Sequence, residues 1–416
     1  MKTNLTHLFM DFIESERASG IVLMLCTIFS MVIANSDFGN AYLDFWHTSV
    51  GFTISDALSL QISLEHWIND GLMAIFFLLI GLEIERELYV GELSELKQAS
   101  LPIIAAIGGM VVPALFYFLF NRGTETAGGT GIPMATDIAF ALGVLALLGN
   151  RVPVALKIFL VALAIIDDLG AITIIALFYQ GDFSPLYFVS ACGVFVGLLI
   201  LNRVGVVRLP LYLVLGVIMW YFTLKSGVHA TIAGVLLAFA VPFGNGDDAS
   251  PSFRLQHFLH HPVAFIIMPL FVLANTGITL TGDWIGGLAT VNSVGILAGL
   301  CLGKPLGITL FSLVAVKSGI SQLPTGVTWK HIIGAGFLGG IGFTMSIFIT
   351  LLAFDNAEVV QSSKIAILLS SFLAGIVGYL ILKMKNTKVS GLQCGRARSC
   401  NLAGENPVPE CRPATG

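Results

Sequence analysis

The chain has 416 residues, of which 56% are hydrophobic and only 11% are charged, and its formal net charge is -4. Ordinary soluble domains carry about 25% charged residues, so lipid is the expected solvent for most of this chain. The slightly acidic balance supplies no basic face, and no nucleic-acid partner is expected.

The first 18 residues have apolar positions at helical spacing, separated by acidic and basic residues. This pattern is typical of an amphipathic helix in the membrane surface and differs from that of a cleavable signal peptide. We therefore predict an interfacial helix over residues 1–18 and a membrane transporter domain over residues 19–388.

Apolar runs after this helix predict an all-α integral membrane protein with about twelve transmembrane helices. Their expected centres are Leu25, Phe77, Val111, Phe140, Ala164, Val194, Val214, Leu236, Pro269, Leu302, Gly342 and Phe372. An even number of crossings puts both termini on one side, and most Lys and Arg residues outside the apolar runs fall on that side. Because positive residues mark cytoplasmic loops, both termini are expected in the cytoplasm.

Between the first two crossings, apolar and polar residues alternate from Trp46 to Ile54 and from Leu58 to Leu64, with a break at Ser55 and Asp56, and the hairpin is expected at about residues 42–64. This period of two predicts an external β-hairpin that is too short and too polar to span the bilayer. A lone hairpin is marginally stable in water, so we expect it to pair with the hairpin of a second copy in a homodimer.

The fourth crossing contains a sequence that interrupts a helix. Pro133 lies in the apolar segment from Gly131 to Asp137 and is followed by Thr136 and Asp137. Proline removes a backbone donor and restrains the residue before it, so the helix should be broken in this segment.

Asp167 and Asp168 lie side by side near the middle of the fifth crossing, the apolar run from Val152 to Phe178. At about 1.5 Å per residue this run crosses a hydrocarbon core of about 30 Å, which places both carboxylates near the midplane. An unpaired charge there costs from about 2.5 to about 17 kcal/mol, so the pair is expected to have a function. Neighbouring side chains on a helix diverge by about 100°, so each carboxylate should face a different partner.

The eleventh crossing is glycine-rich from Gly334 to Gly342, includes Gly340, and continues into Thr344, so it should also unwind. Non-helical backbone at membrane depth persists only where protein or a water-filled cavity satisfies it. Broken segments in both halves of a chain predict an inverted-repeat transporter with its binding site at the breaks. The alternative is a pair of kinked packing helices with small-residue contacts.

Five motifs, in order along the chain, resemble those of the NhaA sodium/proton antiporters of bacterial inner membranes. They are ATDIAF from Ala135, AIIDDLG from Ala164, SGVHAT from Ser226, GKPLG from Gly303 and GIGFTMS from Gly340. The resemblance runs from about Phe12 to Met384. It implies a secondary transporter, not an enzyme, which needs no cofactor and exchanges cytoplasmic Na⁺ or Li⁺ for external protons by electrogenic alternating access.

By this resemblance Asp168 is the principal ion-binding carboxylate and Asp167 is its partner, and the two are the candidate ligands for Na⁺ or Li⁺. Asp137 and Thr136 would lie between the crossed broken helices. A small hard cation prefers oxygen ligands, which these residues and freed carbonyls supply. Burial favours the protonated carboxyl group and a nearby cation favours the ionised one, so protons and Na⁺ would compete for the same oxygens.

Lys304 lies at the centre of the tenth crossing. It either neutralises Asp167 or Asp137 in a structural salt bridge or carries one of the transported protons, since desolvation weakens the hold of a buried lysine on its proton.

A charged cluster at the expected cytoplasmic ends of the second and ninth crossings is the candidate regulator. It contains Glu83, Arg86, Glu87, Arg254, His257, His260 and His261. Histidines change charge near neutral pH, so the cluster is predicted to couple cytoplasmic pH to activity. The resemblance also links these regions to a pH response, although Gln256 stands where the family typically has glutamate. The alternative is a solvated loop that sets topology.

Three other functions share features with a sodium/proton antiporter. An intramembrane aspartyl protease also places aspartates on two crossings, but its Tyr-Asp and Gly-x-Gly-Asp motifs are absent around Asp137, Asp167 and Asp168. A sodium-coupled symporter would use the same broken helices with a roomier, polar pocket, and a channel would not need tight binding by adjacent opposite charges. Residues 389–416 are rich in glycine and proline and are predicted to be a disordered tail or a cloning artefact.

Overall fold

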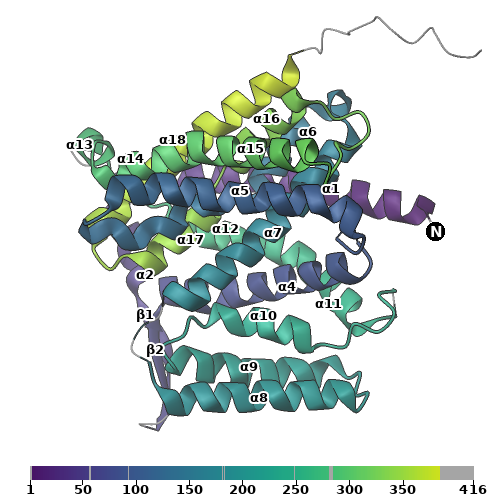
Figure 1. Cartoon of the computed structure of the whole chain (residues 1–416). Helices are drawn as coiled ribbons and strands as arrows, with labels where there is room; N and C mark the ends of the chain where they lie inside the picture. Colours follow the sequence, from purple (N-terminus) through teal and green to yellow (C-terminus); the bar gives the residue numbers. More distant parts are fainter. Residues whose placement is uncertain are drawn as a thin grey trace, which may run out of the picture. The chain divides into compact units, whose positions relative to one another are not determined.

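The computed structural model describes residues 2–384 except residues 56–57, 92, 180, 182, 248 and 281–283, and no side chain of residues 1–17 is described (Figure 1). Contacts group Met1–Lys383 into one unit. The predicted tail over residues 389–416 lies outside the described residues. The described part is almost entirely helical with one β-hairpin, as the composition and the apolar runs predict.

The N-terminal half begins with a continuous helix. Its helical elements are α1 (Lys2–Ala34), α2 (Gly39–His47), α3 (Leu64–His66), η1 (Trp67–Leu72), α4 (Met73–Tyr89), α5 (Leu96–Asn121), η2 (Glu125–Met134), α6 (Ile138–Leu147), η3 (Gly149–Arg151), α7 (Val154–Phe178), α8 (Pro185–Arg203) and α9 (Leu209–Lys225). The helix predicted over residues 1–18 is thus joined to the first crossing without a break. Its place in the membrane surface stays a prediction.

The second half contains three long crossings and one broken crossing. Its elements are α10 (Thr231–Ala240), α11 (Pro251–Pro262), η4 (Val263–Ile267), α12 (Met268–Asn275), α13 (Trp284–Leu288), α14 (Val291–Ala298), η5 (Gly299–Gly303), α15 (Lys304–Lys317), α16 (Trp329–Gly339), α17 (Phe343–Ala353) and α18 (Ala357–Lys383). The segments η1, η4 and η5 are π-helical turns inside longer helices, a feature frequent at functional sites.

Seven helices of the described chain are long and apolar enough to cross a membrane, and the number rises to ten if each bent helix pair is one span. The helices α9 and α10 are apolar but shorter. Eleven of the predicted centres lie on helices, and the remaining one, Gly342, lies at the break between α16 and α17.

Both predicted interruptions are present, and each bends its crossing by 44°. In the fourth crossing a 3₁₀ segment, η2, ends at Met134, and three non-helical residues lead into α6. In the eleventh, α16 continues to Gly339, so the break covers only residues 340–342 and the prediction of unwinding from Gly334 is wrong. The helical glycines serve packing, because an added Cβ would lie 2.6 Å from Leu382 at Gly334 and 2.9 Å from Ile308 at Gly339.

The predicted hairpin consists of the antiparallel strands β1 (Ser49–Ser55) and β2 (Leu58–Ser63). It begins later than predicted because residues 42–47 belong to α2, which turns by 114° from α1. Tyr42 and Trp46 lie one turn apart on α2, with their rings 5.9 Å apart, and the Tyr42 hydroxyl donates to the carbonyl of Leu273 at 2.6 Å. These helical contacts override the period-two pattern of the sequence.

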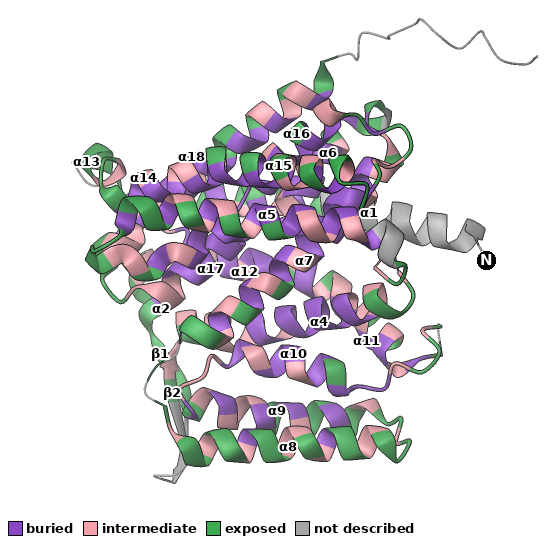
Figure 2. Cartoon of the chain, viewed as in Figure 1, coloured by how far each residue is buried: buried purple, intermediate pink, exposed green. Residues whose placement is uncertain are grey.

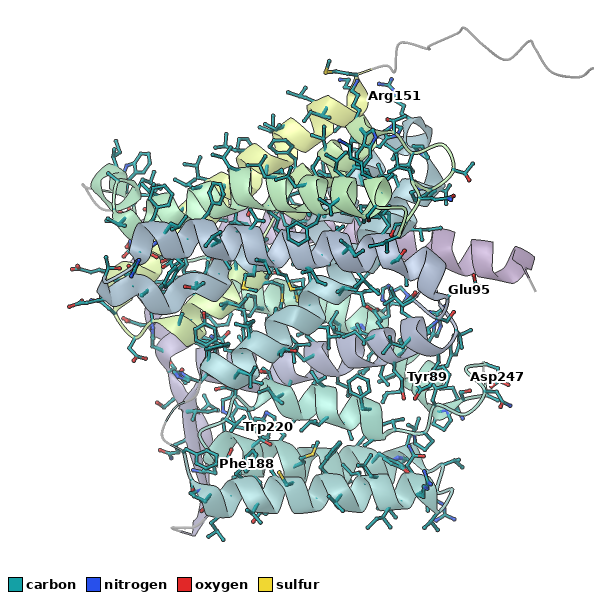
Figure 3. The ribbon with its side chains drawn as sticks, viewed as in Figure 1. Tyr89, Glu95, Arg151, Phe188, Trp220 and Asp247 are labelled. Carbon is teal, nitrogen blue, oxygen red and sulfur yellow. The ribbon has the colours of Figure 1, made fainter. Side chains whose placement is uncertain are left out.

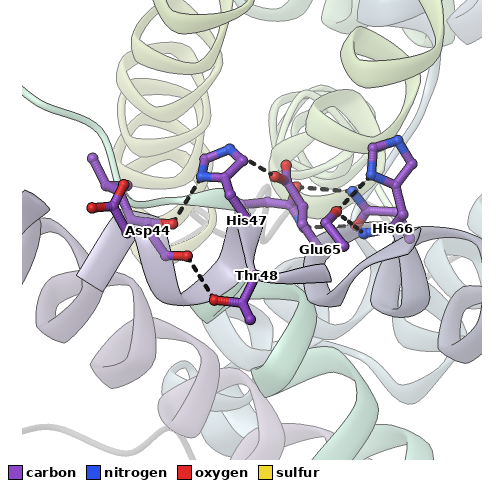
Figure 4. A network of polar contacts seen from close by, with 9 residues as sticks. Asp44, His47, Thr48, Glu65 and His66 are labelled. Carbon is purple, nitrogen blue, oxygen red and sulfur yellow. Dashed lines mark hydrogen bonds and ion pairs between the residues drawn. The ribbon is translucent and has the colours of Figure 1, made fainter. Parts of the chain in front are cut away.

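Polar contacts connect α2 to α3 beside the hairpin (Figure 4). Nε2 of His47 lies 3.4 Å from a carboxylate oxygen of Glu65, and Oγ of Ser63 lies 2.7 Å from Nδ1 of His66. The His47–Glu65 contact links the two chain segments that lead into and out of the hairpin, whereas the Ser63–His66 contact lies at the start of α3.

Burial separates the centre of the helical unit from its edge (Figure 2). In α17 every residue from Phe343 to Thr350 is buried, whereas α8 has only Ala191 and Leu198 buried. The helices α8, α9, α10 and α4 pack in that sequence (Figure 1). The broken crossings therefore lie within protein, and the apolar side chains exposed on α8 and α9 suit contact with lipid.

The loops gather at two ends of the helices. Tyr89, Glu95, Arg151 and Asp247, at or beside loops expected in the cytoplasm, lie at one end, and Phe188 lies toward the other (Figure 3). This arrangement fits helices that run back and forth across a bilayer.

Candidate ion-binding site

The two central aspartates of α7 are both buried, with exposed fractions of 0% for Asp167 and 1% for Asp168. Oδ2 of Asp167 accepts hydrogen bonds from Lys304 Nζ at 2.7 Å and from Thr136 Oγ1 at 2.6 Å. Asp168 instead lines a cavity. The two carboxylates thus face different partners, as the angle between neighbouring helical side chains predicts.

Lys304 begins α15 directly after the π turn η5, and its side chain is fully buried. Besides Asp167, its ammonium group donates to the carbonyl oxygen of Met134, the last residue of η2. The last carbonyls of a helical segment are unpaired and carry partial negative charge, so a cation is favourable there. Lys304 therefore joins α7 to the end of the first broken segment.

The two breaks contact each other through the backbone. The Asp137 N–H donates to the carbonyl of Ile341 at 2.7 Å, and Thr136 Oγ1 lies 2.9 Å from the carbonyl oxygen of Gly339. Each unwound segment thus satisfies backbone groups that the other leaves unpaired, which allows non-helical backbone to exist in the protein interior.

The Asp137 carboxylate caps two helices at once. Its Oδ1 accepts from the N–H of Phe140 at 3.0 Å in the first turn of α6, and its Oδ2 accepts from the N–H of Thr344 at 3.1 Å in the first turn of α17. The Thr344 hydroxyl also donates to Oδ2. A negative charge at two helix N-termini is favourable, so these donors hold Asp137 in place.

The cavity beside the breaks has a volume of about 50 Å³. Its lining includes side chains with oxygen or nitrogen atoms from five helical elements or their ends: Glu83, Thr136, Asp137, Asp168, His260 and Thr344. Oδ1 of Asp168 has no hydrogen-bond partner among the described residues. A buried carboxylate oxygen without a protein partner is available to a water molecule, a proton or a cation.

Asp167 does not line this cavity, so the predicted pair of metal ligands does not converge on one point in this conformation. Asp168, Asp137, Thr136 and Thr344 are the predicted residues that the structure brings together around it. Pro133 and Gly340 pack behind the breaks: an added Cβ at Gly299 would lie 2.6 Å from Pro133, and one at Gly340 would lie 2.4 Å from the carbonyl oxygen of Leu300. An added Cβ at Gly342 would lie only 2.2 Å from the Oγ atom of Ser346.

The predicted regulatory cluster divides between the cavity and its neighbourhood. Glu83 and His260 line the cavity. Arg86 lies over the ring of Phe253 at 5.7 Å, which connects α4 to α11, and His257 stacks on the same ring at 6.4 Å. Glu87, Arg254 and His261 do not line the cavity.

Glu85 was not singled out from the sequence, yet it is 5% exposed and its Oε2 has no hydrogen-bond partner in the described part of the chain. The signal was its place beside Glu83 at the end of an apolar run. Ser346 ends the GIGFTMS motif, and the sequence assigns it no role of its own. Its hydroxyl donates to the carbonyl oxygen of Ile132 at 2.7 Å, a contact between the two broken crossings.

Comparison with known proteins gives a consistent result. A family model described as Na+/H+ antiporter 1 matches residues 10–382. A protein of Flavobacterium psychrophilum named Na(+)/H(+) antiporter NhaA is 59% identical over 385 residues, which cover 92% of this chain and 98% of that protein. Proteins with the same name from Dechloromonas aromatica and Shewanella oneidensis are 59% and 52% identical, covering 92% and 89% of this chain and 97% and 96% of theirs. This chain therefore belongs to the Na⁺/H⁺ antiporter 1 family.

Proposed function

We propose that this protein is a secondary transporter that exchanges cytoplasmic Na⁺ or Li⁺ for external protons across a bacterial inner membrane. The relatives that cover most of the chain are named Na(+)/H(+) antiporters. The observation that carries the proposal is the carboxylate of Asp168, buried in a cavity at the crossing of two broken helices with one oxygen unpartnered among the described residues.

Asp168 is the group at which a cation and a proton exclude each other. The oxygens of Asp137 are held by Phe140 and Thr344, and Oδ2 of Asp167 is held by Lys304 and Thr136. Binding of either a proton or Na⁺ neutralises the charge of Asp168, so occupation by one disfavours the other. Thr136 and the carbonyls near the breaks are the further oxygen ligands that a small hard cation prefers.

Lys304 acts in this proposal as a fixed counter-charge. Its contacts to Asp167 and to the carbonyl of Met134 support a structural salt bridge that keeps Asp167 ionised while Asp168 exchanges its ligand. The other role, in which Lys304 carries a transported proton, requires that these contacts break during the cycle.

Replacement of one proton by one Na⁺ at Asp168 alone would be electroneutral, so the electrogenic transport proposed here requires another group of the site to carry a second proton. Each net charge is then driven by about 2.3 kcal/mol per 100 mV of membrane potential. Alternating access would move the cavity at Asp168 from one side of the membrane to the other, with the two broken crossings as the moving parts.

The cluster of Glu83, Arg86, Glu87, Arg254, His257, His260 and His261 is the proposed pH sensor. Support comes from the position of His260 and Glu83, which line the cavity, so a change of charge in the cluster would alter the field at Asp168. Both termini are proposed to be cytoplasmic, and the β-hairpin is proposed to be external and to form the contact between two copies in a dimer.

A sodium-coupled solute symporter is less compatible with the site. Pockets for organic solutes have volumes of about 300–1,000 Å³. The cavity at Asp168 has about 50 Å³, which suits an ion and a few water molecules.

The test uses purified protein in vesicles that contain a pH-sensitive dye, with NaCl, LiCl and KCl added in turn. The wild type should move protons against Na⁺ or Li⁺, and Asp168→Asn should not. The matched control is Asp355→Asn, since Asp355 is exposed between α17 and α18. Exchange that persists in Asp168→Asn would refute the site, and absence of exchange in the wild type would refute the function.

A further inference from the structure

The segment η2 is a 3₁₀ helix of 10 residues, Glu125–Met134, that leads into the break beside Asp137. Such helices rarely exceed three or four residues because their hydrogen bonds have poorer geometry than those of an α-helix. Its sequence also contains Gly128, Gly129 and Gly131, which favour the unfolded chain. This segment therefore needs support from its neighbours.

Four side chains from four other segments hold the carbonyls of η2. Tyr117 of α5 donates to Thr126 at 2.8 Å, Tyr179 after α7 donates to Gly128 at 2.8 Å, and Ser346 of α17 donates to Ile132 at 2.7 Å. Lys304 holds the last carbonyl, that of Met134. The last two contacts belong to the site described above. The two tyrosines contact Thr126 and Gly128, nearer the start of η2, and have no role in that site.

Both tyrosine hydroxyls occupy space that only glycine leaves free. An added Cβ at Gly129 would lie 2.4 Å from the Tyr117 hydroxyl, and one at Gly131 would lie 2.7 Å from the Tyr179 hydroxyl. The Tyr179 hydroxyl also accepts from the Gly131 N–H at 3.2 Å, so it holds one donor and one acceptor of η2. Gly129 therefore leaves the space that the Tyr117 hydroxyl fills, and Gly131 leaves the space that the Tyr179 hydroxyl fills.

Tyr117 is further tied to the second half of the chain. The single proton of its hydroxyl is shared between the Thr126 carbonyl and Asn292 Oδ1 on α14, which lies 2.6 Å away, and Nδ2 of Asn292 donates to Ser363 Oγ on α18 at 2.7 Å. All three side chains are buried. This chain of hydrogen bonds fixes one end of η2 relative to α14 and α18, while Lys304 fixes the other end.

We propose that Tyr117 and Tyr179 are positioning residues of the ion site, which hold η2 so that Thr136 and Asp137 stay at the correct distance from Asp168. They do not touch the ion. This inference rests on the proposed function of the Asp168 cavity. When a hydroxyl is removed, η2 gains alternative positions, and the oxygens around the cation become less well arranged.

The experiment measures the half-saturating Na⁺ concentration and the maximum rate of exchange in vesicles. Each hydroxyl makes two hydrogen-bond contacts, so Tyr117→Phe and Tyr179→Phe should each raise the half-saturating concentration at least about fivefold, the effect of losing one neutral hydrogen bond, with little change in maximum rate. The matched control is Tyr212→Phe, because Tyr212 is equally buried on α9 and its hydroxyl donates to Val206 at 2.8 Å, outside η2. Its half-saturating concentration should equal that of the wild type.

A double-mutant cycle provides the second test. Gly131→Ala should raise the half-saturating concentration because its methyl group meets the Tyr179 hydroxyl. With Tyr179→Phe in the same chain that clash disappears, and the next contacts lie at 3.3 Å. The double variant should therefore resemble Tyr179→Phe alone. If Tyr117→Phe fails to fold, this cycle still tests the positioning role of Tyr179.

Three results would overturn the inference: unchanged half-saturation in both tyrosine variants, a loss of maximum rate alone, or an additive double variant. The wild type and Asp168→Asn are measured in the same vesicles. If the wild type exchanges ions and Asp168→Asn does not, an unchanged tyrosine variant refutes only the positioning role. If the wild type is inactive, the proposed function itself fails.

Discussion

Asp137 of the fourth crossing and Thr344 of the eleventh are joined twice, because both the N–H and the hydroxyl of Thr344 donate to the same carboxylate oxygen. The first turn of α17 therefore depends on a side chain that also caps α6. The eleventh crossing takes this capping group from the fourth, so α17 would lose it if the two breaks separated.

Thr344→Val is expected to lower the stability of the protein in detergent. Valine keeps the branched shape but removes the hydroxyl, and hydrogen bonds to charged groups contribute about 1.5–3 kcal/mol. The melting temperature of purified protein measures the effect. Thr173→Val is the control, since Thr173 is exposed and bonds only to Leu169 in its own helix. Equal melting temperatures for both variants would show that the Thr344 hydroxyl is not needed.

Lys304→Met should destabilise the protein more than Lys317→Met, because it leaves the buried Asp167 without its cation. Removing one partner of a buried ion pair costs about 3–5 kcal/mol. Adding Asp167→Asn should recover part of that loss, and the thermal melts of the three variants and the wild type measure the recovery. Lys317 is the control because it is exposed at the end of the same helix. If the double variant is less stable than Lys304→Met, the pair is not a structural salt bridge.

Lys304→Gln tests the proton path separately. With Lys304 as a fixed counter-charge, exchange in this variant should remain electrogenic, which a potential-sensitive dye in the vesicles can follow. Electroneutral exchange in a folded Lys304→Gln protein would instead assign a transported proton to Lys304.

Gly307→Ala should prevent normal packing of α15 against α5. An added Cβ at Gly307 would lie 2.0 Å from the carbonyl oxygen of Gly108, and a backbone atom cannot rotate away. Overpacking of this kind costs about 1–3 kcal/mol or more. The yield and melting temperature of the protein measure the effect. Gly193→Ala in α8 is the control, since nothing lies within 4 Å of its added Cβ, and it should be neutral or slightly stabilising.

Alanine at His257, His260 and His261 together should flatten the dependence of exchange rate on cytoplasmic pH. Rates are measured in vesicles over a series of pH values, with His47→Ala, beside the hairpin, as the control. An unchanged profile in the triple variant would favour the alternative of a loop that only sets topology.

Deletion of residues 49–63 should convert a dimer into a monomer, if the hairpin is the contact between copies. The mass of the protein in detergent, corrected for bound detergent, measures this. Monomers before and after the deletion would contradict the predicted role of the hairpin.

Several features of the fold could be predicted because they depend on local sequence. The apolar runs locate the helices, Pro133 marks the first break, and the 100° between neighbours separates Asp167 from Asp168. The length of the second break could not be predicted, because a glycine that unwinds a helix looks the same as one that permits packing. At Gly334 and Gly339 the deciding atoms are those of Leu382 and Ile308, distant in sequence.

The ion site was predictable only in part for the same reason. Buried carboxylates in an apolar run stand out, but the double cap by Asp137 requires the start of α17 to lie against α6. Two tyrosines that hold a distant glycine-rich segment resemble any buried tyrosines in the sequence. The hairpin is predicted to begin at about residue 42, but residues 42–47 are helical, and the Tyr42 hydroxyl donates to the carbonyl of Leu273, which is distant in sequence.

The geometry of η2 also decides how far the chain reaches. A 3₁₀ helix rises about 2.0 Å per residue and an α-helix about 1.5 Å, so a segment of this length extends about 5 Å further than it would as an α-helix. If η2 became α-helical, its final carbonyl, that of Met134, could not reach the Lys304 ammonium group unless the other end of η2 lost its hydrogen bonds to the two tyrosine hydroxyls. The extension of this short segment is what brings the bend before α6 to the depth of the acidic residues.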